Sequence, residues 1–405
     1  MYFCTDLEFN SKSVQKYCII MIYRKLKEEV LRVGASFPVL ILTGPRQSGK
    51  TTLCKMAFPN YRYVNLENPD TREEIIADPI TFLKGNIEGM ILDEAQRYPE
   101  LFSYIQVLVD DDKSMRFVLS GSNNFTLMEK ITQSLAGRAA LLTLLPLSIS
   151  EIDTSITTDE LMLRGFYPAV WGDGRQPQDV YSNYYRTYIE RDLRQLINIK
   201  DLDLFRQFVR LMASRVGNEF NASHICNELG IDVKTVQHWM SILTTSYITF
   251  TLPPYYRNIG KRIVKTPKLY FYETGLVSYL LGLDTPEKVA THPLRGAMFE
   301  NMVVAEFFKR CFNRGKTPNL FYYRDNRQKE VDLVEERSFG QLHTYEIKSA
   351  KRFNTQFCAG IDYFRTLYGD SVVSGEVLYD GEETVSAKDN ICRNWKVSIM
   401  DDKNL

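Results

Sequence analysis

The chain has 405 residues, of which 44% are hydrophobic and 25% are charged, and its 50 lysines and arginines balance 50 aspartates and glutamates. This length exceeds that of one compact core and indicates two or three domains, and the composition excludes a disordered or fibrous protein. Because the net charge is zero, it does not indicate any class of partner, and only local clusters of charge can do so. Seven cysteines without a Cys-x-x-Cys pair are typical of reduced thiols, and no apolar run reaches the roughly 18 residues that span a bilayer. We therefore expect a cytoplasmic protein with no membrane partner.

The N-terminal segment divides at Met21. Residues 1–20 show no clear periodicity, whereas apolar side chains recur at helical spacing from Ile22 to Val33. We interpret residues 1–20 as a leader that is not native, and Met21 as the natural start.

A phosphate-binding loop is predicted after the strand that begins at Val39. The sequence FPVLILTGPRQSGKTTL contains Gly-x-x-x-x-Gly-Lys-Thr between a buried strand and a helix start, which is the P-loop pattern in its required setting. Gly44 and Gly49 permit a tight loop whose amides face phosphates. Lys50 can reach the β- and γ-phosphates of ATP, and the Thr51 hydroxyl can bind Mg²⁺. The expected ATP-binding residues are Gly44, Pro45, Arg46, Gln47, Ser48, Gly49, Lys50, Thr51 and Thr52.

A second short strand, Met90 to Leu92, ends in Asp93 and Glu94. At the end of a parallel strand, Asp93 can hold Mg²⁺ and Glu94 can polarise the attacking water. Alone, this pattern is typical of a solvated strand end. Together with the P-loop it indicates a site for ATP hydrolysis.

A third strand and the segment after it supply two further candidates. Strand ends in an open α/β sheet converge on the ligand crevice, so Ser120, Ser122 or Asn123 could sense the γ-phosphate; a simple turn explains the same residues. Arg138 precedes another apolar strand and could act as an arginine finger, a role that requires a homo-oligomer if it acts in trans. The alternative for Arg138 is a surface salt bridge.

Residues 221–243 predict a helix, a tight turn at Gly230 and a second helix that Asp232 caps. The exposed face of the second helix, with Lys234 and Gln237, can enter a major groove of DNA. A predicted hairpin wing follows, and five basic residues with no acidic neighbour could neutralise phosphates there: Arg257, Lys261, Arg262, Lys265 and Lys268. A winged helix can equally dock a protein or act as a wedge between domains. DNA and protein therefore both remain possible partners of this segment.

Near the C-terminus, a strand carries Asp332 and the next carries Glu346 and Lys348, one residue apart and therefore on one face. Hairpin pairing would place both carboxylates around a divalent metal, with Lys348 orienting water or stabilising the phosphate. Glu300, on an upstream helix, would add a ligand. The order resembles the PD-(D/E)xK nuclease-like core. The motif does not distinguish a cutting site from a dormant one.

As a whole, the chain resembles prokaryotic AAA+-type ATPases that carry a C-terminal domain of uncharacterised function. The resemblance runs from about residue 21 to 352 through TGPRQSGKTTL, ILDEAQR, LSGSNNF, LAGRAALLTLLPLSISE, YIERDLRQL and VKTPKLYFYETGLVSYLLG. It implies that the P-loop and the Asp93–Glu94 motif serve ATP, and that the C-terminus has a nuclease-like fold. Glu273 stands where this family leads us to expect an aspartate, which affects a local turn.

These patterns predict an α/β chain with three parts: an AAA+-like P-loop ATPase domain at 21–150, a helical and winged-helix segment at 151–290, and an α/β nuclease-like domain at 291–405. We expect Mg²⁺-dependent binding and hydrolysis of ATP, coupled to engagement of DNA. The alternative is a nucleotide-dependent regulatory or protein-binding switch whose nuclease-like domain is inactive.

Overall fold

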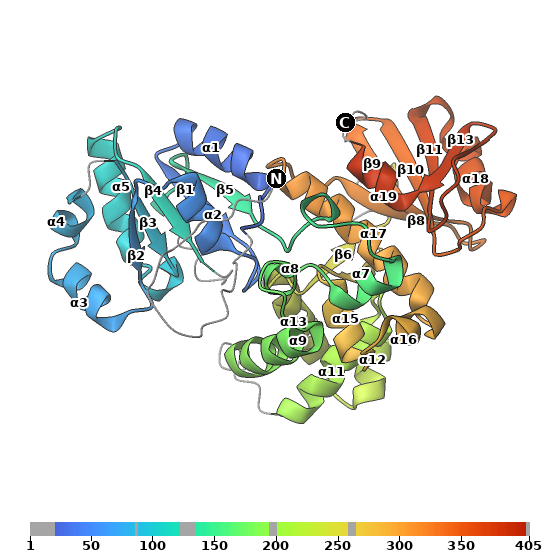
Figure 1. The fold of residues 1–405 in the computed structure, drawn as a ribbon, viewed down its shortest axis with the longest axis horizontal. Coiled ribbons are helices and arrows are strands. Elements are labelled where there is room, and N and C mark those ends of the chain that lie inside the picture. The colour runs from blue at the N-terminus through green and yellow to red at the C-terminus, as the bar shows by residue number, and fades with distance from the viewer. Residues whose placement is uncertain (1–20, 86–87, 122–133, 194–200, 258–264, 402–405) are drawn as a thin grey trace, which may run out of the picture. The chain divides into compact units, whose positions relative to one another are not determined.

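The computed structural model describes residues 21–85, 88–121, 134–193, 201–257 and 265–401 (Figure 1). The predicted leader, Ser122, Asn123, Lys261 and Arg262 lie outside them. The chain forms two compact units. Unit 1 comprises Met1–Leu147, Thr245–Tyr247 and Lys309–Thr317, and unit 2 comprises Ser148–Thr244, Ile248–Phe308 and Pro318–Leu405. Within the described ranges, no helix combines the length and the apolar character needed to cross a bilayer.

Unit 1 is built on a parallel sheet, which confirms the predicted α/β class. Among its described residues, five strands lie in the order β2-β3-β4-β1-β5. They are β1 (Val39–Thr43), β2 (Arg62–Asn65), β3 (Met90–Asp93), β4 (Phe117–Ser120) and β5 (Ala139–Thr143). The helices are α1 (Leu26–Ser36), α2 (Lys50–Ala57), α3 (Pro69–Ala77), α4 (Pro79–Lys84) and α5 (Leu101–Asp111).

Alternate side chains of each strand feed two separate cores, as the period of two in a strand requires. Val39 and Ile41 of β1 pack in a core with residues of α3, α4 and α5. Leu40 and Leu42 pack with residues of α1 and α2. Helices therefore cover both faces of the sheet, which explains why its strands read as continuous apolar runs.

The strand register gathers the motif residues at one edge of this sheet. Strand β1 lies between β4 and β5, and β3 pairs with β4, all in parallel. Ser120 is level with Leu42 on one side and with Asp93 on the other. The start of the P-loop and the end of β3 therefore flank the end of β4, where ligands of open α/β sheets bind.

Unit 2 begins with helices and a two-stranded antiparallel ribbon. The helices are α7 (Thr158–Arg164), α8 (Pro168–Trp171), α9 (Pro177–Tyr184), its π-helical continuation η3 (Tyr185–Leu193), α11 (Leu202–Ser214), α12 (Ala222–Leu229), α13 (Val233–Thr245), α15 (Thr274–Leu280) and α16 (Pro286–Thr291). The ribbon strands are β6 (Thr249–Leu252) and β7 (Lys268–Phe271). Helix α12 ends at Gly230, whose φ is +66°, and the Asp232 carboxylate caps α13 by accepting the Thr235 amide at 2.9 Å. The two helices lie where the sequence placed them, and the winged-helix assignment stays a prediction.

Glu273 caps helix α15 in the place where the family resemblance suggested an aspartate. Its carboxylate accepts the Gly275 amide at 3.1 Å and, because the side chain is one methylene longer, also the Phe166 amide at 2.9 Å. The Tyr181 hydroxyl donates to the same carboxylate at 2.9 Å. The glutamate in place of an aspartate therefore still accepts hydrogen bonds from the backbone of this turn.

The remainder of unit 2 is a mixed sheet with helices. Among the described residues, its six strands lie in the order β12-β13-β11-β10-β9-β8. They are β8 (Leu320–Arg324), β9 (Glu330–Ser338), β10 (Gln341–Lys348), β11 (Val372–Tyr379), β12 (Val385–Ala387) and β13 (Asn390–Asn394), with helices α17 (Arg295–Phe312), α18 (Ala359–Tyr368) and α19 (Trp395–Met400). In Figure 1 these elements run from orange to red. The nuclease-like assignment of this sheet stays a prediction.

The ribbon and the mixed sheet of unit 2 are joined through the backbone. After β6, the Tyr255 amide donates to the Tyr322 carbonyl at 2.6 Å, and the Tyr322 amide donates to the Pro253 carbonyl at 3.0 Å. Tyr322 belongs to the edge strand β8, so the chain that leaves the ribbon satisfies the otherwise open edge of the sheet.

Candidate nucleotide site and C-terminal carboxylate cluster

The P-loop between β1 and α2 has the backbone that its glycines predict. Gly44 has φ of +140° and Gly49 has φ of +92°, a region that favours glycine. A Cβ atom on Gly44 would lie 2.1 Å from the Leu144 carbonyl oxygen, so a side chain there is excluded by contact as well as by conformation. Gly49 also caps helix α2, which leaves the amides of the first helical turn available to an anion.

Lys50 lies within the loop and bonds to its carbonyl groups. The ammonium donates to the Gly44 oxygen at 3.0 Å and to the Pro45 oxygen at 2.8 Å. Burial lowers the pKa of Lys50 to about 8, an effect that the nearby carboxylates of Glu94 and Asp93 oppose. An ammonium held this way is a buried cation that lacks a direct anionic partner, as a phosphate-binding lysine requires.

Asp93 is the centre of a hydrogen-bond network at the end of β3. The Thr51 hydroxyl donates to Oδ2 at 2.7 Å and the Tyr63 hydroxyl donates to the same atom at 2.9 Å. The Ser120 hydroxyl donates to Oδ1. Burial and the bond to Asp93 raise the pKa of Tyr63. Because Thr51 and Asp93 present hard oxygen atoms side by side, the pair fits a Mg²⁺ ion.

Glu94 follows Asp93 in a left-handed conformation, with φ of +54°. A non-glycine residue in this region costs about 1–3 kcal/mol and is found where function requires it. Its carboxylate accepts a hydrogen bond from the Gln96 side chain and is partly exposed.

Arg24 fastens the P-loop, a role that sequence reasoning missed. It is 4% exposed and lies just before α1. One guanidinium nitrogen donates to the Ser48 carbonyl at 2.6 Å and another to the Leu145 carbonyl at 2.7 Å. Tyr63 was likewise not assigned to the site, whereas Ser120 was one of the three candidates for sensing the γ-phosphate. No motif marks Arg24 or Tyr63, because their partners lie far along the chain.

Arg138 does not reach the nucleotide site of its own chain. It immediately precedes β5, whose first residue Ala139 is level with Val39 at the start of β1, so it lies at the edge of the sheet opposite the P-loop. Its guanidinium instead forms two 2.7 Å hydrogen bonds with the Asp110 carboxylate. The prediction of an arginine finger is therefore wrong for action in cis. A role in trans stays a prediction.

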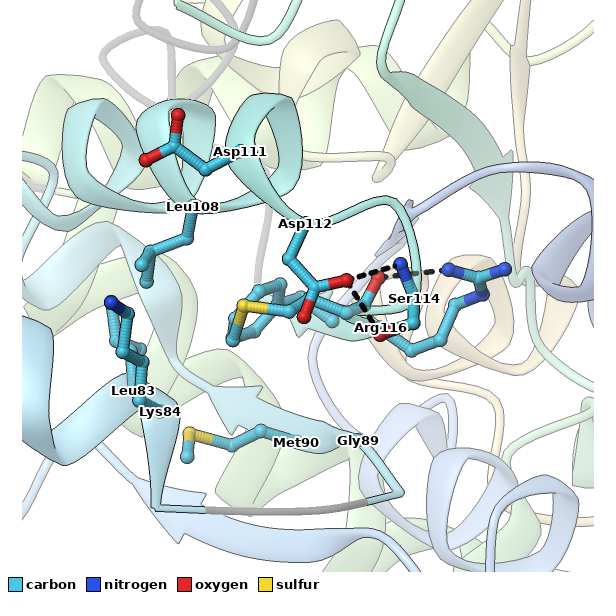
Figure 2. A pocket seen from close by; sticks show the side chains of 11 residues that line it. Leu83, Lys84, Gly89, Met90, Leu108, Asp111, Asp112, Ser114 and Arg116 are labelled. Carbon is cyan, nitrogen blue, oxygen red and sulfur yellow. Dashed lines mark hydrogen bonds between the residues drawn. The ribbon is translucent and has the colours of Figure 1, made fainter.

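A hollow of about 460 Å³ also lies in unit 1, but away from the P-loop (Figure 2). Gly89, Met90, Arg116 and Phe117 line it, so it opens at the amino ends of β3 and β4. Asp112 on its rim accepts the Ser114 amide at 2.8 Å. Because phosphate-binding groups meet at the carboxyl ends of these strands, this hollow is not the nucleotide site.

The predicted carboxylates near the C-terminus come together in unit 2. Strands β9 and β10 pair antiparallel with Leu333 opposite Tyr345, which brings Asp332 beside Glu346. Lys348 lies 2.6 Å from Glu346 Oε1 and 3.3 Å from Asp332 Oδ2. Burial, followed by the Asp332 charge, raises the pKa of Glu346 to about 8.

The metal site predicted from Glu300, Asp332 and Glu346 is not assembled. Among the residues that the structure describes, no three potential ligand side chains are gathered for a metal ion. Glu300 instead lies 3.0 Å from the ammonium of Lys268, a residue of β7. The carboxylates are arranged around lysines, so as they stand they do not fit a complete metal site. This corrects the sequence prediction.

The predicted DNA-contacting residues are divided between surface and core. Helix α13 buries Val236, Met240 and Leu243 and exposes Lys234 and Gln237. Lys265 is exposed. Lys268, which the sequence placed in the same basic cluster, is 4% exposed and cannot reach a DNA phosphate.

Family models match three consecutive parts of the chain. Family models match an AAA domain at residues 36–153 and two domains of unknown function, DUF8612 at 155–287 and DUF4143 at 295–398. Two uncharacterised proteins, Mb2031c of Mycobacterium bovis and Rv2008c of Mycobacterium tuberculosis, are each 33% identical over 359 residues, which cover 84% of this chain and 77% of theirs.

Solved structures that match this chain are more distant in sequence. The Walker-type ATPase PABY2304 of Pyrococcus abyssi is 14% identical with a TM-score of 0.45, over 64% of this chain and 95% of its own. The STAND protein PH0952 of Pyrococcus horikoshii, which has a tetratricopeptide repeat sensor, is 11% identical with a TM-score of 0.23, over 72% of this chain and 47% of its own. Matches with TM-scores this low carry no argument about this chain. The family of the chain is therefore inferred from the AAA domain model and the mycobacterial relatives.

Proposed function

Because the chain belongs to a family of P-loop ATPases that includes these two mycobacterial proteins, we propose that it binds ATP with Mg²⁺ and hydrolyses it. The observation that carries the proposal is the 2.7 Å hydrogen bond between Thr51 and Asp93. It joins the end of the P-loop to the end of β3, where a nucleotide-bound metal needs oxygen ligands.

Each residue of the site has a distinct task in this proposal. The amides of the loop hold the phosphates, and Lys50 exchanges the Gly44 and Pro45 carbonyl oxygens for phosphate oxygens. Thr51 and Asp93 would hold Mg²⁺, which when bound neutralises phosphate charge. Glu94 accepts a proton from the attacking water, and its partly exposed carboxylate leaves access for that water.

Two variants test the assignment of hydrolysis. Lys50→Ala is expected to abolish nucleotide binding, whereas Glu94→Gln is expected to bind ATP normally and to hydrolyse it at least 100-fold more slowly. Glu100→Gln removes an exposed carboxylate outside the site and serves as the matched control. Equal hydrolysis by Glu94→Gln and the control would remove Glu94 from the mechanism.

The finer part of the proposal is that the nucleotide state changes how unit 2 engages DNA. The exposed residues Lys234 and Gln237 on α13 and the exposed Lys265 support it, because such side chains contact bases and phosphates in helix-turn-helix proteins. Anisotropy of a labelled DNA duplex, measured with ADP and with a non-hydrolysable ATP analogue, tests the coupling. Identical affinities in both states would contradict it.

The second candidate is a nucleotide switch whose C-terminal domain does not cut DNA. The arrangement of the carboxylates around lysines rather than around a common metal position favours it. Supercoiled plasmid incubated with Mg²⁺ or Mn²⁺ distinguishes the candidates. Nicking that persists in Lys50→Ala and disappears in Asp332→Ala would identify a nuclease, and intact plasmid under every nucleotide supports the switch.

A further inference from the structure

Tyr63 lies in the nucleotide site, but the proposed hydrolysis gives it no task. It belongs to β2, which pairs in parallel with β3 so that Tyr63 is level with Ile91 and Asn65 is level with Asp93. Its ring is partly buried and packs against the core that contains residues of α1 and α2. Tyr63 therefore lies on the face of the sheet that the P-loop helix covers, and its hydroxyl reaches Asp93 from the neighbouring strand.

The Asp93 carboxylate, which is buried, accepts hydrogen bonds at both oxygens. Oδ1 accepts the Ser120 hydroxyl and, at 3.2 Å, the Glu94 amide. Oδ2 accepts the Thr51 hydroxyl at 2.7 Å and the Tyr63 hydroxyl at 2.9 Å. A carboxylate has about four lone-pair sites, so these donors fix the plane of the group. Because Thr51 would also serve Mg²⁺, Tyr63 is the donor to Oδ2 that has no second task.

Helix α2 holds the ring of Tyr63 as well. The ammonium of Lys55 lies 3.5 Å from the centre of the ring, which is a cation–π contact. Thr51 and Lys55 are four residues apart on α2 and therefore lie on one face of the helix. Thr51 contacts Asp93, Asp93 contacts Tyr63, and Tyr63 contacts Lys55, so the contacts form a closed circuit through α2, β3 and β2.

The hydroxyl of Tyr63 keeps its proton in this setting. Burial, followed by the hydrogen bond to Asp93, raises the pKa of Tyr63. The hydroxyl is therefore a hydrogen-bond donor throughout the neutral pH range, and Asp93 is its acceptor.

We propose that Tyr63 is a positioning residue of the ATPase site, whose hydroxyl orients the Asp93 carboxylate for the Mg²⁺ ion that accompanies ATP. Tyr63 acts through Asp93. Hydrogen-bond partners of metal-binding side chains typically change metal affinity or activity by about 10- to 100-fold when they are lost. The inference rests on the proposed function, because it requires that the chain binds ATP together with Mg²⁺.

Tyr63→Phe removes the hydroxyl and keeps the ring under Lys55. Titration calorimetry with ATP, in EDTA and in Mg²⁺, is expected to show unchanged affinity in EDTA and about tenfold less gain in affinity from Mg²⁺. The Mg²⁺ concentration that gives half-maximal hydrolysis is expected to rise by about the same factor. Tyr61→Phe is the matched control, because the Tyr61 ring stacks on Phe58 with 4.8 Å between centroids and should leave both measurements unchanged.

A double-mutant cycle with Asp93→Asn separates positioning from a merely structural role. If Tyr63 acts through Asp93, Tyr63→Phe has no further effect on the Mg²⁺ dependence once Asp93→Asn is present. Lys55→Met provides a second variant that leaves the core intact, since Lys55 is exposed. It loosens the ring without removing the hydroxyl and is expected to reduce the gain from Mg²⁺ by about twofold to fivefold. Circular dichroism verifies that each protein is folded.

Three outcomes overturn the inference: an unchanged gain from Mg²⁺ in folded Tyr63→Phe, a loss that persists in full beside Asp93→Asn, or an equal loss in Tyr61→Phe. If Tyr63→Phe does not fold, an unchanged gain in Lys55→Met overturns it. The wild-type titration distinguishes this failure from that of the proposed function. A wild type that binds no ATP refutes both, whereas a wild type that binds ATP more tightly with Mg²⁺ leaves only the role of Tyr63 in question.

Discussion

The Thr51 hydroxyl and the Asp93 carboxylate lie 2.7 Å apart, although 42 positions separate them in the chain. Strand register explains the contact, because Asp93 and the strand that leads to the P-loop end at the same edge of the sheet. The pair joins the two motifs into one site and makes Asp93 the natural target for the first test.

Asp93→Asn is expected to retain ATP binding and to lose hydrolysis by about 100-fold, since weakening a metal ligand removes roughly 3 kcal/mol of transition-state stabilisation. Binding is measured by calorimetry and turnover by phosphate release at saturating Mg²⁺. Asp111→Asn, an exposed carboxylate of the same unit, is the control. Wild-type turnover by Asp93→Asn would exclude Asp93 from the metal site.

Lys50→Met is expected to raise the thermal stability of the nucleotide-free protein, because it removes a buried charge whose pKa is lowered to about 8. Lowering the pKa of Lys50 from 10.5 to about 8 corresponds to a loss of roughly 3 kcal/mol of folding stability at neutral pH. The variant regains this free energy, less the contribution of the two hydrogen bonds that are lost. Differential scanning calorimetry at pH 7.5 provides the comparison. A lower midpoint for the variant would show that the buried ammonium is stabilising.

The same lysine predicts a pH dependence. Between pH 8 and 10.5 the folded chain binds fewer protons at Lys50 than the unfolded chain does, so the stability of the wild type rises across this window relative to Lys50→Met. The advantage of the variant should be full below pH 8 and should shrink by pH 9.5. An advantage that is constant with pH would contradict the lowered pKa.

Arg24→Ala is expected to destabilise unit 1 by about 3 kcal/mol and to weaken ATP binding, because the Ser48 and Leu145 carbonyls lose a charged donor. Arg32→Ala is the control. Arg32 lies on the neighbouring helix α1 and its side chain is 68% exposed in a pair with Glu29, so its loss should cost little. Equal effects of the two variants on ATP affinity would remove Arg24 from the support of the loop.

Lys265→Ala is expected to weaken DNA binding by the same factor for different sequences and to reduce the salt dependence by about one phosphate contact. Lys316→Ala removes another exposed lysine, from unit 1, and should leave the salt slope unchanged. Anisotropy titrations over a range of KCl concentrations measure the slope. Identical salt slopes for the two variants and the wild type would show that Lys265 does not contact a DNA phosphate.

The P-loop was predictable from sequence because all of its residues lie in one stretch whose chemistry is local. Gly44, Gly49, Lys50 and Thr51 follow one another, and their conformations depend on the loop itself. The site beyond the loop was less predictable. Arg24 and Tyr63 reach it from other elements, and neither stands in a pattern that distinguishes it from a surface residue.

Burial explains the predictions that the structure corrects. The run of basic residues from 257 to 268 predicts a charged surface, but β7 is buried along its whole length, and Lys268 at its start lies against Glu300. The hairpin that carries Asp332 and Glu346 was predictable from spacing, whereas the lysine that comes to Glu300 from another strand was not. The positions of charged residues along the sequence do not predict which side chains they contact in the folded protein.

Titration calorimetry with ATP and Mg²⁺ tests the central claim most directly. The account predicts a saturable heat of binding for the wild-type chain and none for Lys50→Ala, with both proteins folded by circular dichroism. Absence of heat with the folded wild type, or equal heats for the two proteins, would contradict it.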